Sequence, residues 1–172
     1  CTQITSLLKL FQDTEPIFFI FYIEEIILKY NLEENIINDL RKPTEYHKEK
    51  YLLLRNEYNK YKNPLYLYVL IIYSFCHQIR FNSNGEFNLP VGKRDFNKKM
   101  EQKLVDFIDR IQEQNCIFTC RDFREFDSSA LTPQDFVYVD PPYLITCATY
   151  NEQGGWDETA EKDLLAFLDD LN

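Results

Sequence analysis

Apolar residues recur at helical spacing through the first half of the chain. They predict helices over Thr2–Phe11 and Ile17–Tyr30, and a charged amphipathic helix over Thr44–Tyr61. The apolar face of the third helix is made of Tyr51, Leu54, Tyr58 and Tyr61. Pro64 suits the first turn of a further helix that runs to Phe75. The first half is therefore expected to be helical.

The pattern changes after residue 79. Arg80–Asn88 alternates polar and aromatic residues around Asn84-Gly85, a strong signal for a β-hairpin. The other elements expected here are an amphipathic helix, two short strands and a last helix, at Phe96–Gln114, Cys116–Cys120, Asp135–Val139 and about Asp157–Leu171. Asp157 is the expected N-cap of the last helix. Its inward residues are expected to be Leu164, Leu165, Leu168 and Leu171. These elements predict an α/β fold, with a helical module beside part of a sheet.

Composition places the chain among globular proteins. It has 172 residues, of which 45% are hydrophobic and 16% aromatic. There are four glycines: Gly85, Gly92, Gly154 and Gly155. Their positions rule out both G-x-G-x-x-G and a Walker loop, so a glycine-rich nucleotide loop cannot be built from this sequence.

The cysteines and the apolar segments suggest a cytoplasmic protein. The five cysteines include no C-x-x-C pair and the chain has two histidines, so a metal site is not expected. Buried thiols in a reducing cytoplasm are expected instead. The apolar stretches Ile17–Leu28 and Leu65–Phe75 are shorter than the roughly 20 residues of a membrane span, and we see no secretory signal. The first residue is Cys1, and the chain reads as a piece of a longer protein.

The net charge of −9 is unevenly distributed. Residues 41–103 contain 13 basic and 6 acidic residues, a balance of +7. The rest of the chain has 6 basic and 22 acidic residues, a balance of −16. Phosphate is the expected partner of the basic segment. The alternative is that its lysines only solvate the faces of helices.

The tetrapeptide Asp140-Pro141-Pro142-Tyr143 follows the expected strand directly. Ligands of open α/β sheets gather at the carboxyl ends of strands. The two prolines fix φ and remove two N–H donors, which leaves a stiff corner of acceptors. The Asp140 carboxylate and the Pro141 carbonyl could accept the two hydrogens of a planar amino group, while the Tyr143 ring stacks on its face. A capped β-turn with an aromatic plug is the structural alternative.

Two segments together resemble the Dam-like DNA adenine-N6 methyltransferases. Asp140–Tyr143 matches the D-P-P-Y motif of that family, and Ile79–Gly92 is similar to its recognition hairpin. The resemblance implies transfer of a methyl group from S-adenosylmethionine to N6 of a flipped adenine in double-stranded DNA. It also implies a partial Rossmann-like methyltransferase sheet beside an α-helical target-recognition module. The expected division is residues 1–95 for recognition and 96–172 for catalysis.

The resemblance also implies roles for individual residues. The catalytic residues would be Asp140, Pro141, Pro142 and Tyr143. The cofactor would be held by Asp122, Phe123 and Asp140. Arg80 would read a guanine edge, with Asn82, Asn84 and Asn88 as hydrogen-bonding neighbours. Phosphates would be contacted by Lys93, Arg94, Lys98 and Lys99. Loop Leu144–Trp156 could close over the flipped base.

The sequence also departs from the family pattern. The F-x-G-x-G loop that holds the cofactor in family members is absent. The chain is therefore either a fragment of the enzyme, with a cognate restriction enzyme as an expected partner, or an inactive DNA-binding module. Methylation of RNA or of a protein glutamine is a third possibility, since planar amides suit the same corner. The hairpin favours duplex DNA.

Overall fold

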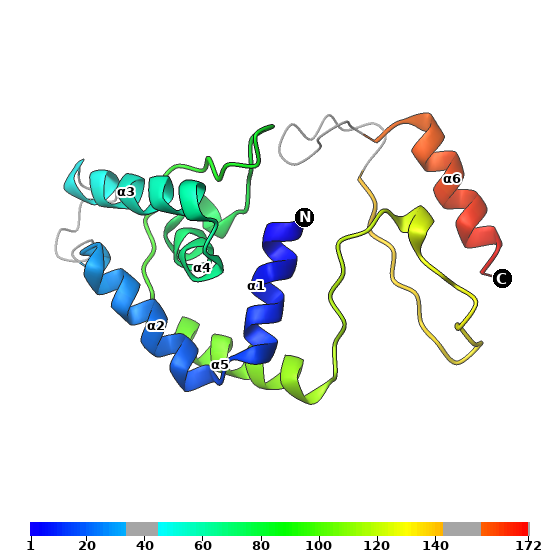
Figure 1. Ribbon diagram of the computed structural model, residues 1–172, viewed down its shortest axis with the longest axis horizontal. Coiled ribbons are helices and arrows are strands. Elements are labelled where there is room, and N and C mark those ends of the chain that lie inside the picture. The colour runs from blue at the N-terminus through cyan, green and yellow to red at the C-terminus, as the bar shows by residue number, and fades with distance from the viewer. Residues whose placement is uncertain (34–44, 143–155, 172) are drawn as a thin grey trace. The chain divides into compact units, whose positions relative to one another are not determined.

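Residues 1–33, 45–142 and 156–171 are described by the computed structural model of the chain (Figure 1). The chain divides into two compact units, Cys1–Thr119 and Cys120–Asn172. This division follows contacts between residues and not their roles. The expected separation of recognition from catalysis at residues 95 and 96 therefore stays a prediction.

The first unit is helical, as expected. Its α-helices are α1 (Thr2–Asp13), α2 (Pro16–Lys29), α3 (Glu45–Tyr61), α4 (Pro64–Tyr73) and α5 (Lys98–Glu113). Pro16 and Pro64 stand in first turns, where the N–H that proline lacks would have no helical partner. The Asn97 side chain caps α5 by accepting hydrogen bonds from the backbone N–H groups of Lys99 and Met100. These local signals explain why the predicted ends agree with the observed ones to within a few residues.

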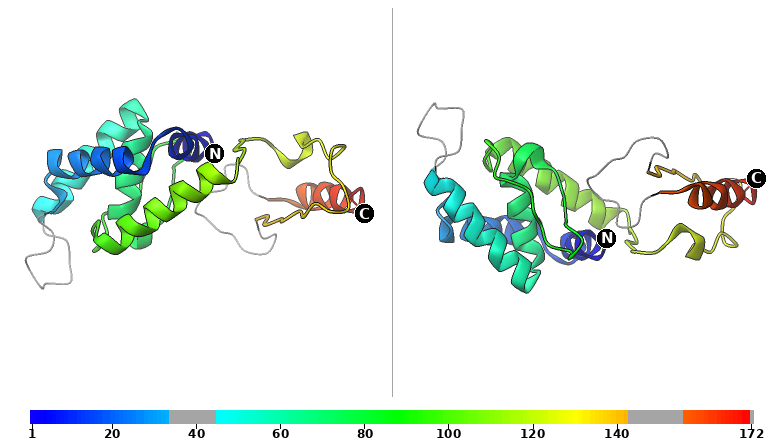
Figure 2. Two further views of the ribbon diagram at one scale, coloured as in Figure 1. Left: turned by 90° about the horizontal axis from the view of Figure 1, so that it is seen from below. Right: turned by 90° about the horizontal axis from the view of Figure 1, so that it is seen from above.

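Helix α4 is the centre of the first unit. It contacts α1, α2 and α3, while α5 contacts α1 and α2 (Figures 1 and 2). Its sequence is apolar on every side, which is typical of a helix surrounded by protein. Its most deeply buried residues, each at most 1% exposed, are Leu67, Val69, Leu70, Ile72 and Tyr73.

The apolar face predicted for α3 is confirmed for three of its four residues. Tyr51, Leu54 and Tyr58 are at most 1% exposed. Burial raises the pKa of Tyr58 to about 12, so this ring stays neutral in the core. The prediction is wrong for Tyr61, which is 62% exposed and is the last residue of the helix.

The expected hairpin at Arg80–Asn88 is present in a short form. Phe81 and Phe87 make one antiparallel bridge. The Asn82 N–H donates to the Glu86 carbonyl at 2.9 Å, and the Gly85 N–H donates to the Asn82 carbonyl at 2.9 Å. Gly85 has a φ of +70°, a left-handed conformation that glycine adopts readily. A hairpin this short needs support from the rest of the fold.

The second unit has a small core of its own. A short 3-10 turn, Phe123–Glu125, contacts α6 (Glu158–Asp169). The predicted cap of α6 is confirmed, since the Asp157 side chain accepts from the Ala160 N–H. Leu164 is buried as expected, whereas the expectation is wrong for Leu165, which is 54% exposed. The rings in this unit that contact one another are Phe123, Phe126, Trp156 and Phe167.

The predicted α/β fold is wrong for the residues that the structure describes. They form helices and isolated bridges, with no β-strand, and neither 116–120 nor 135–139 belongs to a sheet. The partial Rossmann-like sheet is therefore not observed. A strand requires a neighbour that pairs with its backbone, and no described segment pairs with 136–139. The apolar sequence of that segment has high β-propensity, but its Phe136 and Tyr138 side chains are 88% and 77% exposed.

Two smaller expectations concern membranes and thiols. None of the helices in the described ranges has the length and apolarity that a bilayer crossing requires. Cys1, Cys76 and Cys120 are exposed, so the expectation of buried thiols is wrong for them. Cys116 is partly buried, and Cys147 lies outside the described residues.

Candidate nucleic-acid interface and catalytic motif

The recognition hairpin is fastened to α3 by bonds to its backbone. The Asn59 side chain donates to the Phe87 carbonyl at 3.1 Å and accepts from the Phe87 N–H at 2.8 Å. At the tip, Lys62 Nζ donates to the Gly85 carbonyl at 2.7 Å. After the hairpin, the Leu89 carbonyl accepts from both the Tyr51 hydroxyl and Arg55. The hairpin therefore takes its position from a helix that precedes it in sequence.

Apolar contacts and one close backbone approach add to this attachment. Phe87 is 1% exposed and packs edge-on against Tyr58 and Phe81, with ring centroids 6.3 and 5.8 Å apart. The Gly92 N–H donates to the Tyr73 carbonyl at 2.7 Å. A Cβ at Gly92 would lie 2.4 Å from the Ser74 carbonyl oxygen, so only glycine fits without a backbone shift.

Arg80 and Asn88 form a pair across the hairpin. Arg80 Nε donates to Asn88 Oδ1 at 2.7 Å, and Arg80 Nη2 donates to the Asn88 backbone carbonyl at 3.1 Å. The Asn88 N–H in turn donates to the Arg80 carbonyl at 3.2 Å. The guanidinium expected to read guanine is thus oriented by one of its expected neighbours.

The other two asparagines of the hairpin differ in their surroundings. Asn82 Oδ1 accepts from the N–H groups of Asn84 and Glu86, and Asn82 Nδ2 donates to the Glu86 carboxylate at 2.8 Å. These bonds build the turn. Asn84 is exposed at the tip. The hairpin therefore carries all of these residues, and the Asn82 side chain stabilises its turn.

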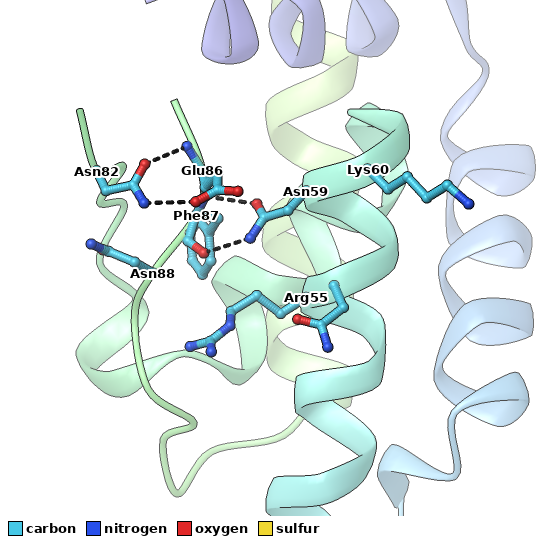
Figure 3. Close-up of a pocket in the computed structure, with 8 residues that line it drawn as sticks. Arg55, Asn59, Lys60, Asn82, Glu86, Phe87 and Asn88 are labelled. Carbon is cyan, nitrogen blue, oxygen red and sulfur yellow. Dashed lines mark hydrogen bonds between the residues drawn. The ribbon is translucent and has the colours of Figure 1, made fainter. Parts of the chain in front are cut away.

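A polar hollow of about 470 Å³ lies between the hairpin and α3, beside their direct contacts (Figure 3). It is lined by Arg55, Asn56, Asn59, Lys60, Asn82, Glu86, Phe87 and Asn88. In the close-up, Asn59 reaches from α3 to the hairpin, whereas the Lys60 side chain extends away from it (Figure 3). The hollow is therefore bordered by the same Asn59–Phe87 contact that anchors the hairpin to α3.

The basic residues expected on phosphate lie beyond the hairpin. Lys93 and Arg94 are exposed, as are Lys98 and Lys99 in the first turn of α5. Lys98 Nζ lies 2.7 Å from a carboxylate oxygen of Glu101. This hydrogen bond raises the pKa of Lys98.

The D-P-P-Y motif lies in the second unit at the end of an extended segment. Asp140 and Pro142 are exposed and Pro141 is partly buried. Tyr143 and most of the loop Leu144–Trp156 lie outside the described residues. The described part therefore presents the two expected acceptors, the Asp140 carboxylate and the Pro141 carbonyl, on an exposed stretch of chain.

Asp122 and Phe123, the residues expected to hold the cofactor, have other partners here. Asp122 caps the 3-10 turn by accepting from the Arg124 N–H, and both of its carboxylate oxygens lie 3.1 Å from Arg124 Nη1. The backbone bond and the guanidinium lower the pKa of Asp122. Arg124 also pairs with Asp163 at 2.8 Å. The Phe123 ring packs against Trp156 and Phe167.

The expected role of Asp122, Phe123 and Asp140 in holding S-adenosylmethionine stays a prediction. The Asp122 carboxylate already accepts three N–H contacts from Arg124. Asp140 is exposed. Metal-binding groups of three or more His, Cys, Asp or Glu side chains are not found in the described ranges.

The hairpin supports from α3 were not predicted from the sequence. Arg55 and Asn59 are polar residues four positions apart, which places them on one side of α3, and Lys62 directly follows its last residue. That spacing was a usable signal. It was obscured because the neighbouring lysines and glutamates give α3 the pattern of an ordinary solvated helix.

Comparison with known proteins adds independent findings. A family model described as D12 class N6 adenine-specific DNA methyltransferase matches residues 9–172. The chain is 37% identical to the modification methylase StsI of Streptococcus sanguinis, over 99% of the chain and 25% of that relative. It is 41% identical to the type II methyltransferase M.FokI of Planomicrobium okeanokoites, over 88% of the chain and 26% of that relative.

A more distant relative is the DNA adenine methylase of Escherichia coli (strain K12). It is 33% identical over 60% of the chain and 37% of its own length. The chain thus spans about a quarter of the length of the first two relatives and somewhat more of the third.

Proposed function

The chain belongs to the D12 class N6 adenine-specific DNA methyltransferase family, and on that premise we propose that it supplies the DNA-reading hairpin and the adenine-holding motif of such an enzyme. The proposed reaction transfers a methyl group from S-adenosylmethionine to N6 of an adenine in double-stranded DNA. Residues 1–95 would read the target, and residues 96–172 would carry the catalytic motif.

The fastened hairpin is the observation that carries this proposal. Arg80 is oriented by Asn88 at 2.7 Å, on a hairpin held by Asn59 and Lys62. A rigid, oriented guanidinium suits bidentate contact with O6 and N7 of guanine in the major groove. Asn84, exposed at the tip, would contact a neighbouring base. Lys93, Arg94, Lys98 and Lys99 would contact phosphates and add affinity without sequence information.

The D-P-P-Y motif would act on the adenine after it leaves the duplex. Extrusion of a base costs about a few kcal/mol. The Asp140 carboxylate and the Pro141 carbonyl would accept the two amino hydrogens, which directs the nitrogen lone pair away from the ring. Pro142 would stiffen the corner and Tyr143 would stack on the base. The exposure of Asp140 and Pro142 supports access by a ligand.

The proposal also includes a cofactor. S-adenosylmethionine supplies the methyl group in this reaction class, and Asp122, Phe123 and Asp140 are the residues proposed to contact it. Since Arg124 occupies the Asp122 carboxylate, that role requires Asp122 to exchange partners. A pocket would also need groups other than these three.

Two sets of variants test the reading function by fluorescence anisotropy with duplexes of different sequence. Arg80→Ala should lose about 1–3 kcal/mol of discrimination at one base pair. Replacing both Lys98 and Lys99 with Gln should weaken binding about equally for all sequences and reduce its salt dependence. Unchanged sequence preference in the Arg80 variant would refute the assignment of the hairpin.

A DNA-binding module without transferase activity is the second candidate. It is favoured by the Arg124 contacts on Asp122. Incubation with labelled S-adenosylmethionine and adenine-containing duplexes separates the two candidates. Label transfer that is lost in Asp140→Ala would establish the transferase. A cognate restriction enzyme is a further proposed partner, since two relatives are named as a modification methylase and a type II methyltransferase.

A further inference from the structure

Asn59 makes a two-way connection between α3 and the recognition hairpin. Asn59 accepts from the Phe87 N–H at 2.8 Å and donates to the Phe87 carbonyl at 3.1 Å. These are the two bonds that a neighbouring β-strand would make to one residue. The Asn59 amide therefore stands in for a third strand beside a hairpin that has one bridge of its own.

The other side-chain attachments constrain the hairpin less closely. Lys62 and Gln3 both donate to the Gly85 carbonyl, at 2.7 and 3.5 Å. Tyr51 and Arg55 both donate to the Leu89 carbonyl. A donor alone can follow a carbonyl that shifts by a fraction of a residue. Asn59 needs both an N–H and a carbonyl of the same residue, so it selects Phe87.

The residue that Asn59 selects lies next to the reading pair. Phe87 is buried at 1% exposure, and Asn88 follows it with its side chain on Arg80. Successive residues of an extended chain point to opposite faces, so a slip of one residue would exchange their faces. Asn88 would then turn toward the core and Arg80 would lose its orienting carbonyl and amide.

We propose that Asn59 is a positioning residue for target recognition, which acts through Phe87 and Asn88 to fix the base edge that Arg80 reads. This inference rests on the proposed function, because it assumes that Arg80 contacts DNA. Asn59 itself needs no contact with DNA. Its substitution should therefore change sequence discrimination more than it changes affinity for DNA of any sequence.

The test compares Asn59→Asp with Asn56→Asp in the 172-residue chain. Aspartate at 59 can still accept from the Phe87 N–H, but it cannot donate to the Phe87 carbonyl and places a negative charge beside it. Asn56 is exposed on the same helix and lines the same hollow, so Asn56→Asp brings the same charge change without a bond to the hairpin. Binding is measured by anisotropy with the preferred duplex and with duplexes altered at the base pair that Arg80 reads.

Asn59→Asp is expected to lower the discrimination ratio about tenfold, because the oriented Arg contact is lost. Both variants should weaken binding to random-sequence DNA by the same small factor. Hydrogen exchange of the Phe87 amide should become faster in Asn59→Asp alone. An unchanged ratio together with faster Phe87 exchange would overturn the inference, and so would an equal loss of ratio in Asn56→Asp.

A conservative substitution covers the case in which Asn59→Asp does not fold. Asn59→Gln keeps the donor and the acceptor on a longer side chain, so its ratio should lie between those of the parent and the Asp variant. Asn56→Gln is its matched control and should keep the parent ratio. A parent chain that binds every duplex equally would refute the proposed function. A parent chain that discriminates between duplexes, together with an Asn59→Gln variant that discriminates equally well, would overturn only the inference about Asn59.

Discussion

In Cys1–Thr119, aromatic and aliphatic side chains from five helices and the hairpin form one core, whereas in Cys120–Asn172 the apolar residues before the D-P-P-Y motif face solvent. Phe87 of the hairpin is 1% exposed, while Phe136 and Tyr138 are 88% and 77% exposed. Both segments have sequences typical of β-structure. They differ in whether the described residues supply partners for their backbone and side chains.

This difference shows what each unit can specify alone. The hairpin backbone receives side-chain hydrogen bonds from Asn59 and Lys62, so residues of its own unit set its geometry. Among the described residues, no helix donates a bond of this kind to the segment 136–139. We infer that the hairpin is preorganised, and that the segment with the D-P-P-Y motif depends on contacts that the described residues do not provide.

The largest expected effect is the loss of the Phe87 ring. Phe87→Ala should lower the free energy of unfolding of the first unit by about 3–5 kcal/mol, because it removes a buried ring that packs on Tyr58 and Phe81. Tyr138→Ala removes a ring of similar size that is 77% exposed, and should change the free energy of unfolding of its own unit by less than about 0.5 kcal/mol. Urea denaturation followed by circular dichroism measures both. Similar losses in the two variants would mean that Tyr138 is buried in solution and would erase the contrast.

A buried histidine should make the stability of the first unit depend on pH. His47 is 1% exposed beside the Tyr73 ring, and burial lowers the pKa of its side chain to about 4. As the pH falls from 6.5 toward 4, His47 becomes protonated in the unfolded chain but stays neutral in the folded chain. Stability should therefore fall across that window by up to about 3 kcal/mol.

The second unit should respond in a different range. Local hydrogen bonds lower the pKa values of Asp122, Asp127 and Asp135, so these carboxylates contribute above their ordinary pKa and lose their contribution only at more acidic pH. Thermal melts between pH 7 and 4.5 check the prediction. His47→Phe should flatten the dependence and His77→Asn should retain it. A slope that survives in His47→Phe would contradict the role of His47.

The sequence predicted the elements whose signals are local. The helix starts at Pro64 and Asp157 were predicted from proline geometry and a side-chain cap, which involve only a few consecutive residues. The hairpin around Asn84-Gly85 is of the same kind. Such signals stay valid whatever surrounds the segment.

The sheet could not be predicted correctly by the same reasoning. The segment 136–139 has strand composition, but a strand also needs a partner, and composition does not say whether one is present. The attachment of the hairpin to Asn59 was missed for a related reason. It joins residues 28 positions apart, and no local rule relates them. The roles assigned to Arg80 and Asp140 stay predictions.

A smaller effect is expected where two backbones of the first unit meet. Gly92→Ala should destabilise this unit by about 1–3 kcal/mol, because the new Cβ would lie 2.4 Å from the Ser74 carbonyl oxygen. Gly85→Ala is the control at the hairpin tip, where the nearest atom is 3.4 Å away on the flexible Gln3 side chain. Its cost arises from the φ of +70° and should be about 1 kcal/mol. A larger loss of stability in Gly85→Ala than in Gly92→Ala, measured by denaturation, would show that the contact with Ser74 relaxes easily.

The smallest effects compare one helix cap in each unit. Asn97 accepts from the N–H groups of Lys99 and Met100, and Asp157 accepts from that of Ala160. Loss of either cap should cost about 1 kcal/mol in its own helix. Helix α5 buries Leu104, Ile108 and Ile111 in the first core, whereas α6 buries Leu164 in the second unit.

The consequences of the two losses should therefore differ. Asn97→Ala should lower the midpoint of the main unfolding transition, because α5 unfolds together with the core that it covers. Asp157→Ala should leave that midpoint in place and instead speed hydrogen exchange at the start of α6, while Asp157→Asn should keep the slow exchange because asparagine also caps. A shift of the main midpoint in Asp157→Ala would mean that the two units unfold as one, and the independence of the reading surface from the catalytic motif would then be lost.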